Sequence, residues 1–324
     1  MSTEAAMASS PPPTQDLSAF EEVGHQAENR SFVEQAESLG LNWEVLQVPI
    51  RLSSEHHTGK IADWKALVRS DTGDILNVPK KRYTPVQPAQ ILDFFDVLRK
   101  DEDLTMDVVG ILGGGKIIWG LAQTGRVISV DSSDPVKEYI LVASSSDYSM
   151  STLVKRTSVR VICQNTLELA IRLGDEGAGF LKRSHAGAFD FKYAREKIMA
   201  IRKDDAELER FQTEISKLSH HNVTEEQAEK YFTTLLFPGK KVEDVRANKR
   251  SSTRLDDALR MYHTAPGQEL DTARGTAWGL LNTITYMTDH VSGKTPDSRM
   301  RSAFFAEGAT LKEKARKAAL KLVA

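Results

Sequence analysis

The chain has 324 residues, of which 40% are hydrophobic and 27% charged, and its formal net charge at pH 7 is −2. This composition is typical of a globular protein with a sizeable core, and it excludes a polycation, so a nucleic-acid site has to be a local basic patch. The single cysteine, Cys163, excludes an internal disulfide framework and a zinc site with several thiolate ligands.

The first 30 residues are rich in Ala, Ser, Pro, Gln and Glu and include the run Pro11-Pro-Pro13. They are too poor in apolar side chains to fold alone, so we expect a disordered tail over residues 1–30. The start of the chain lacks the charged and apolar regions of a signal peptide, and no apolar run is long enough to span a bilayer. We therefore expect a cytoplasmic protein without membrane contact.

Residues 31–187 read as an α+β core domain. Strand-like segments at 41–50, 64–70 and 75–78 precede a helix over 88–100, which gives the order β-β-β-α. The helix is predicted from a proline near its start and from an apolar stripe at helical spacing. That stripe consists of Ile91, Leu92, Phe94, Phe95 and Leu98.

A β-rich stretch follows, with strands predicted at 105–112, 116–123, 127–130, 136–143 and 151–162. Turns about every ten residues, including Gly113–Gly115 and Thr124–Arg126, indicate an antiparallel meander. A helix is predicted over 166–173, capped by Asn165 or Thr166. The predicted fold is therefore an antiparallel sheet packed by the helices at 88–100 and 166–173.

The C-terminal half has a helical pattern. We expect a helical region over residues 188–300 that packs on the core, and a basic C-terminal helix within 301–324. Thr224 and Gln227 have the spacing of a capping box. Helices are predicted at 189–218, 224–236, 254–262, 270–290 and 309–322, with a basic loop at 240–252.

No catalytic, metal or cofactor motif stands out. Gly113–Lys116 lacks the spacing of a phosphate-binding loop and lies between strands, so it predicts a hairpin turn. The adjacent histidine pairs at 56–57 and 220–221 lack metal-ligand spacing. Cys163 is better explained as a buried thiol than as a nucleophile, because no base is identifiable beside it. We expect no metal and no cofactor.

The charge distribution is more informative. Residues 151–200 contain nine basic and five acidic side chains, a local balance of +4, interleaved with four aromatic residues. A basic groove with aromatic side chains is what single-stranded nucleic acid requires. The alternative, which composition alone favours, is a solvated helix face beside core aromatics. The basic loop at 80–83 adds to the nucleic-acid interpretation.

The predicted interface has two parts. Phosphates are neutralised by Lys155, Arg156, Arg160, Lys182 and Arg183, while the rim is formed by Lys80, Lys81 and Arg82, with Tyr83 stacking on bases. If about five phosphates are contacted, log affinity falls with log salt at a slope of roughly −3.5 for single strands.

Several motifs resemble one family. They are Gly110-Ile-Leu-Gly-Gly-Gly-Lys-Ile-Ile-Trp119, Tyr139-Ile-Leu-Val-Ala-Ser-Ser-Ser-Asp147, Arg160-Val-Ile-Cys-Gln-Asn-Thr-Leu167, Lys182-Arg-Ser-His185 and the stretch from Gly275 to His290. Over residues 40–300 the chain resembles the phage/plasmid-like protein family, domain of unknown function nine-three-two. The resemblance implies a bacteriophage or plasmid gene product in the cytoplasm of a bacterial host. The β-β-β-α order is also similar in outline to ring-forming single-strand annealing recombinases.

Three hypotheses follow. The first is a non-enzymatic, oligomeric protein that binds single-stranded DNA and promotes annealing in recombination. The second is an interaction protein of a mobile element that binds a host protein and no DNA. The third is an enzyme whose site is assembled from Cys163, Asn165, His185 and His290.

Overall fold

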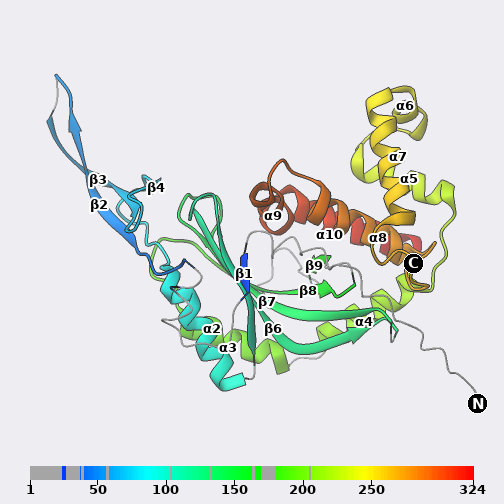
Figure 1. Cartoon of the computed structure of the whole chain (residues 1–324), viewed down its shortest axis with the longest axis horizontal. Coiled ribbons are helices and arrows are strands. Elements are labelled where there is room, and N and C mark those ends of the chain that lie inside the picture. Colours follow the sequence, from blue (N-terminus) through cyan, green and yellow to red (C-terminus); the bar gives the residue numbers. More distant parts are fainter. Residues whose placement is uncertain are drawn as a thin grey trace, which may run out of the picture.

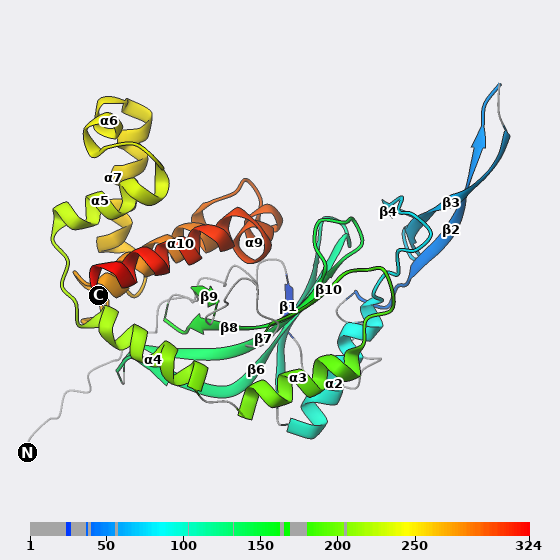
Figure 2. The same cartoon turned by 180° about the vertical axis from the view of Figure 1, so that it is seen from behind.

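The computed structural model describes residues 24–26, 37, 40–55, 58–102, 104–131, 133–162, 165–168, 180–203 and 206–324. As predicted, the chain is α+β, with antiparallel sheets and a helical C-terminal half. The main sheet lies between helices on both sides, and a second, narrow sheet projects away from it (Figures 1 and 2). Residues 1–23 of the expected tail lie outside the described part.

The main sheet has seven strands in the order β1-β5-β6-β7-β8-β10, with β9 paired to β8. Its centre is the predicted antiparallel meander. Those four strands are β5 (Thr105–Leu112), β6 (Ile117–Ser129), β7 (Pro135–Ser145) and β8 (Thr152–Arg160). Gly113, Gly114 and Gly115 all have positive φ, which confirms the hairpin turn, since glycine adopts this backbone without steric cost.

One predicted turn is a bulge instead. The strands expected at 116–123 and 127–130 form the single strand β6, which passes through Thr124–Arg126. Its pairing with β7 shifts register between Gln123 and Val127, and Gly125 has a φ of 76°. Between the pairs that Gln123 and Val127 form, β6 advances by four residues and β7 by two, so β6 carries two extra residues, and such a bulge bends a strand without ending it.

The edges of the sheet hold two corrections. Gly24–Gln26, inside the expected tail, forms β1 and pairs with β5. Thr166–Glu168, where a helix was predicted over 166–173, is the strand β9, and residues 169–179 lie outside the described part. Thr166 does not cap a helix, because its hydroxyl donates to Asp289. The other outer strand is β10 (Phe180–Arg183), paired antiparallel with β8.

Helices cover both faces of the main sheet, so polar side chains on these faces can be buried. Along β6, Ile118 and Ala122 share a core with α2 (Pro88–Glu102) and α3 (Phe191–Lys203). The alternate residues Trp119 and Leu121 share a core with α9 (Pro296–Phe305). A strand that is buried on both faces has apolar residues at consecutive positions, as the first part of β6 has.

The second sheet has the order β2-β3-β4. Its strands are β2 (Val45–Ser53), β3 (Thr58–Arg69) and β4 (Ile75–Asn77). Beyond Val45 and Leu67 the β2–β3 hairpin leaves the body of the protein, at the upper left of Figure 1. We call residues 46–55 and 58–66 the arm, and none of them is buried.

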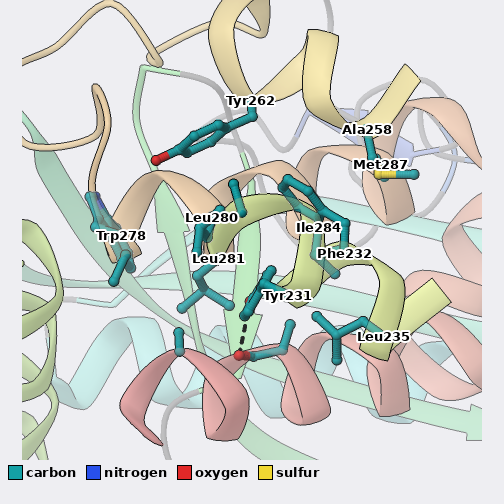
Figure 3. Packing of buried hydrophobic residues seen from close by; sticks show 14 of the residues in the cluster. Tyr231, Phe232, Leu235, Ala258, Tyr262, Trp278, Leu280, Leu281, Ile284 and Met287 are labelled. Carbon is teal, nitrogen blue, oxygen red and sulfur yellow. Dashed lines mark hydrogen bonds between the residues drawn. The ribbon is translucent and has the colours of Figure 1, made fainter. Parts of the chain in front are cut away.

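Except for α9, the helices from Ala206 onward pack around one core, which Figure 3 shows from close by. Tyr231 lies in this core and its hydroxyl donates to the carbonyl of Ala315 at 2.9 Å. The capping box of Thr224 and Gln227 is confirmed. The helices are α4 (Ala206–Ser219), α5 (Glu225–Leu236), α6 (Val242–Ala247), α7 (Lys249–Thr264), α8 (Ala277–Tyr286), the π-helical turn η1 (Met287–Val291), α9 and α10 (Glu307–Leu322).

Three helix boundaries differ from prediction. The basic loop expected at 240–252 is helical, because α6 occupies most of it and Asn248 caps α7. The helix expected at 270–290 begins only at Ala277, where Thr276 caps it. The helix expected at 189–218 is described as α3 and α4, with residues 204–205 between them outside the described part.

Candidate nucleic-acid interface

A groove of about 530 Å³ lies where three separate segments meet. It is lined from the loop after β4 (Lys80, Arg82, Tyr83), from the β7–β8 loop (residues 148–151) and from the end of β10 onward (Lys182 and residues 184–186). Two segments that the sequence analysis selected separately, at 80–83 and 182–183, therefore converge. We call this cavity the groove.

The groove is basic. Lys80, Arg82 and Lys182 line it and are exposed, and none of the described lining residues is acidic. Lys81, also exposed, flanks it. Arg183 is half-buried, and its guanidinium carbon lies 5.5 Å from the centre of the Tyr193 ring. The cations that line the groove can hold phosphate oxygens without competition from a lining carboxylate.

Aromatic rings form one wall. The Tyr83 ring stacks on His185 with centroids 4.5 Å apart, and Tyr148 meets its edge at 4.8 Å. Tyr83 is buried and its hydroxyl donates to the carbonyl of Ser145. Burial, with further contributions from Tyr148 and Asp147, raises the pKa of Tyr83 far above its ordinary value, so its phenol is neutral.

The exposed ring is Tyr148 rather than Tyr83, which corrects the prediction that Tyr83 stacks on bases. Tyr148 is 56% exposed and has a φ of 64°, a left-handed conformation uncommon outside glycine. Tyr148 was not predicted from the sequence. The available signal was a single aromatic residue in a turn otherwise made of serines and aspartate.

His185 ties the walls together. Its carbonyl accepts from the backbone N–H of Thr84 at 2.8 Å, and its two ring nitrogens lie 3.3 Å from the carbonyls of Thr84 and Met150. Burial lowers the pKa of His185 below its ordinary value, an effect larger than that of the two carbonyls. The neutral imidazole is therefore a spacer that fixes the groove rather than a cation within it.

The prediction that Lys155, Arg156 and Arg160 of β8 neutralise phosphates is wrong, because these side chains are buried and do not line the groove. Arg160 donates to both oxygens of Asp134, at 2.6 and 2.8 Å, and Arg156 donates to Glu138 at 2.5 Å. Lys155 donates to the carbonyl of Phe304 at 3.2 Å. All three side chains are buried between the helix layers, so in this structure they do not reach a phosphate.

A pattern in the sequence could have revealed these pairs. The carboxylates at 134 and 138 are four residues apart, as are the arginines at 156 and 160. In the β7–β8 register Arg156 faces Ile140 and Arg160 faces Val136. Each carboxylate is therefore two residues from the position opposite its arginine, which is the diagonal pairing of an antiparallel sheet.

The basic side chains of the C-terminal helix also fall into a buried, paired group and an exposed group. In α10, Lys312 is buried and donates to Asp289 at 2.8 Å, while Arg316 is buried and pairs with Glu214. The remaining lysines, Lys314, Lys317 and Lys321, are exposed.

The residues of the enzyme hypothesis are held by different neighbours. Cys163 lies outside the described residues. Asn165 donates to the carbonyl of Asn282 at 3.1 Å, His185 belongs to the groove, and the His290 ring stacks on Tyr286.

Neither a metal-binding cluster nor a membrane-spanning helix is present among the described residues. No group of three or more His, Cys, Asp or Glu residues among them is placed to hold a metal ion. No helix in the described ranges has the length and apolarity needed to cross a membrane.

The comparison with known families gives one match. The model of a domain of unknown function, DUF932, matches residues 75–317, three quarters of the chain. The chain belongs to the DUF932 family. The match to DUF932 includes all three segments of the groove and begins after the arm. No curated protein and no solved structure matches the chain.

Proposed function

We propose that this DUF932 protein binds single-stranded DNA in the groove. The observation that carries the proposal is the convergence of three exposed cations around the exposed ring of Tyr148, with no acidic residue among the described lining. Proteins that hold single strands combine a positive surface for the phosphates with aromatic rings on which bases stack.

The residues of the groove have distinct roles in this proposal. Lys80, Arg82 and Lys182 contact successive phosphates, and a base stacks on Tyr148. A stacked base contributes about 1–3 kcal/mol of binding energy, judged by alanine substitution in other proteins. Tyr83 and His185 contact one another beneath Tyr148 and hold its ring in place.

The geometry favours single strands over duplex. A cavity of about 530 Å³ is of the size that receives a small-molecule ligand. A base inserts there only after it is unpaired and unstacked from its neighbours, which costs less in a single strand than in duplex.

A more specific form of the proposal is a single-strand annealing protein of a bacteriophage or plasmid, acting as a homo-oligomer in the bacterial cytoplasm. Its support is the resemblance of the β-β-β-α order, seen here as β2-β3-β4-α2, to annealing recombinases.

The test is a fluorescence-anisotropy titration with a labelled strand of about six thymidines and with a hairpin whose stem has about six G·C-rich base pairs, which stays duplex under the same conditions. Three phosphate contacts predict a salt slope of about −2 for the single strand. Undetectable or salt-independent binding overturns the proposal. A chain that binds no oligonucleotide but forms a stable complex with a host protein would instead favour the interaction-protein hypothesis.

A further inference from the structure

Trp64 is an unusual tryptophan in this chain. It lies in the arm on β3 and is 41% exposed, whereas Trp43, Trp119 and Trp278 are each at most 2% exposed. These four are all the tryptophans that the chain contains. An indole ring is a large apolar surface, and together with the exposed Leu46 and Leu52 on the same arm it marks a surface for a ligand or partner.

The structure connects Trp64 to the groove through Lys80. The two residues form an antiparallel β-bridge, and the Lys80 Nζ lies 6.0 Å above the centre of the Trp64 ring. On its other side, the backbone N–H of Lys80 donates to the Tyr148 hydroxyl at 3.3 Å. A cation that lines the groove is therefore flanked by the two exposed rings.

The arm carries a pair of like charges that an anion would stabilise. Arg51 and Lys60 are both exposed and lie directly opposite one another in the β2–β3 register. Like charges at facing positions of an antiparallel pair are destabilising. A phosphate between them would turn this repulsion into two favourable contacts, although Glu55 and Asp63 keep the arm as a whole close to neutral.

The outer edge of the arm argues against a strand of another protein as the occupant. Pro49 lies in the middle of β2, whose outer edge is unpaired in the described structure. Proline has no N–H to donate to an added strand, and it is one of the residues that protect sheet edges from pairing.

From these observations we infer that single-stranded nucleic acid continues from the groove onto the arm. The strand passes Lys80, stacks a base on Trp64, and places a phosphate between Arg51 and Lys60. This inference rests on the proposed function, because it extends the same binding path. It adds a second aromatic contact and lengthens the binding site.

Oligonucleotide length separates the two sites. A strand of about six thymidines fills the groove alone, whereas one of about 16 also reaches the arm. We expect Trp64→Ala to weaken binding of the longer strand roughly tenfold and that of the shorter one less than about twofold, while Trp64→Phe retains most of the affinity. Val48→Ala, an exposed apolar truncation on the same arm, is the matched control and should change neither affinity.

The facing pair of Arg51 and Lys60 is tested by the salt dependence of binding. With three groove contacts and two arm contacts, the longer strand should have a salt slope of about −3.5, against about −2 for the shorter one. Changing Arg51 and Lys60 together to Gln should return the slope of the longer strand to about −2.

Iodide quenching of tryptophan emission gives the direct test, because Trp64 is the exposed indole. Saturation with the longer strand should protect the wild-type emission from iodide, and Trp64→Phe should lack the iodide-sensitive component from the start. If the longer strand binds without protecting the wild-type emission from iodide, and Trp64→Ala binds that strand as tightly as the wild type, the inference fails. The proposal that the groove binds single strands would still stand. If neither strand binds, both proposals fail. If iodide access falls with protein concentration alone, a second copy covers the arm and the inference is also overturned.

Discussion

The basic residues of β8 and those of the groove look alike in the sequence, yet they have opposite environments in the fold. Arg156 and Arg160 are buried and paired with carboxylates, while Lys80 and Lys182 are exposed around a cavity with no acidic residue among its described lining. The local balance of basic and acidic residues in the sequence does not distinguish the two sets. What separates them is whether a carboxylate lies on the neighbouring strand and whether helices cover the face.

The Arg160–Asp134 pair joins the sheet to the helical half. Asp134 accepts not only from Arg160 but also from the Thr272 hydroxyl and the Trp278 indole, and Arg160 also donates to the Gly267 carbonyl. These partners lie around the start of α8, so the pair fixes the sheet to the helical core. Removing two charges from water is costly, so the pair as a whole adds little stability, whereas removing one member leaves the other charge buried and unpaired.

The largest expected effect is on stability. Arg160→Ala leaves Asp134 buried without its ionic partner, and the loss of one member of a buried pair typically costs about 3–5 kcal/mol. The free energy of unfolding from urea titration should fall by that amount. The matched change Lys182→Ala, at an exposed groove cation, should lower it by less than about 0.5 kcal/mol. Equal losses of unfolding free energy in the two variants would contradict the distinction between buried, paired cations and exposed groove cations.

The second effect is on binding. Lys182→Glu places a negative charge at the phosphate path, and affinity for the six-thymidine strand should fall roughly tenfold or more at low salt. The free energy of unfolding should stay close to that of the wild type, since the side chain is exposed. Unchanged affinity would remove Lys182 from the interface.

The third effect isolates stacking from folding. Tyr148→Gly removes the ring at a position whose backbone, with φ near 64°, suits glycine. Affinity should fall roughly fivefold to tenfold, within the range for one stacked base. Thermal unfolding should not show a comparable loss. Destabilisation together with unchanged affinity would make Tyr148 a packing residue.

The smallest effect concerns pH. The pKa of His185 is lowered by burial, so between its folded value and the ordinary value of about 6.5 the unfolded chain binds a proton that the folded chain does not. Stability should therefore fall as the pH drops through about 6.5. Comparing urea unfolding at pH 7.5 and 5.5 should show a smaller pH dependence in His185→Gln than in the wild type. An identical pH dependence in both would contradict the neutral-spacer role.

The fold was largely predictable where periodicity is local. The meander, the glycine hairpin and the α2 helix follow from alternation, turn residues and an apolar stripe. The strand at Thr166, where a helix was expected, does not follow from local periodicity. Thr166 is hydrogen-bonded to Asp289, which is 123 residues away in the sequence. A short polar segment takes its structure from such distant partners rather than from its own propensity.

The site was predictable in part for the same reason. Clusters of charge at 80–83 and 182–183 are visible in the sequence, but their convergence with Tyr148 depends on how three loops meet. The burial of Lys155 depends on α9 covering the sheet, and its partner Phe304 is 149 residues away.

The central claim is that nucleic acid binds the groove, and its most direct test compares two triple variants with equal loss of charge. One replaces Lys80, Arg82 and Lys182 by Gln, and the other replaces the exposed α10 residues Lys314, Lys317 and Lys321 by Gln. In anisotropy titrations of the six-thymidine strand, the α10 variant should retain the wild-type slope of about −2, and the groove variant should lose both the slope and most of the affinity. A groove variant that binds as tightly as the wild type, or two variants weakened equally, would contradict the claim.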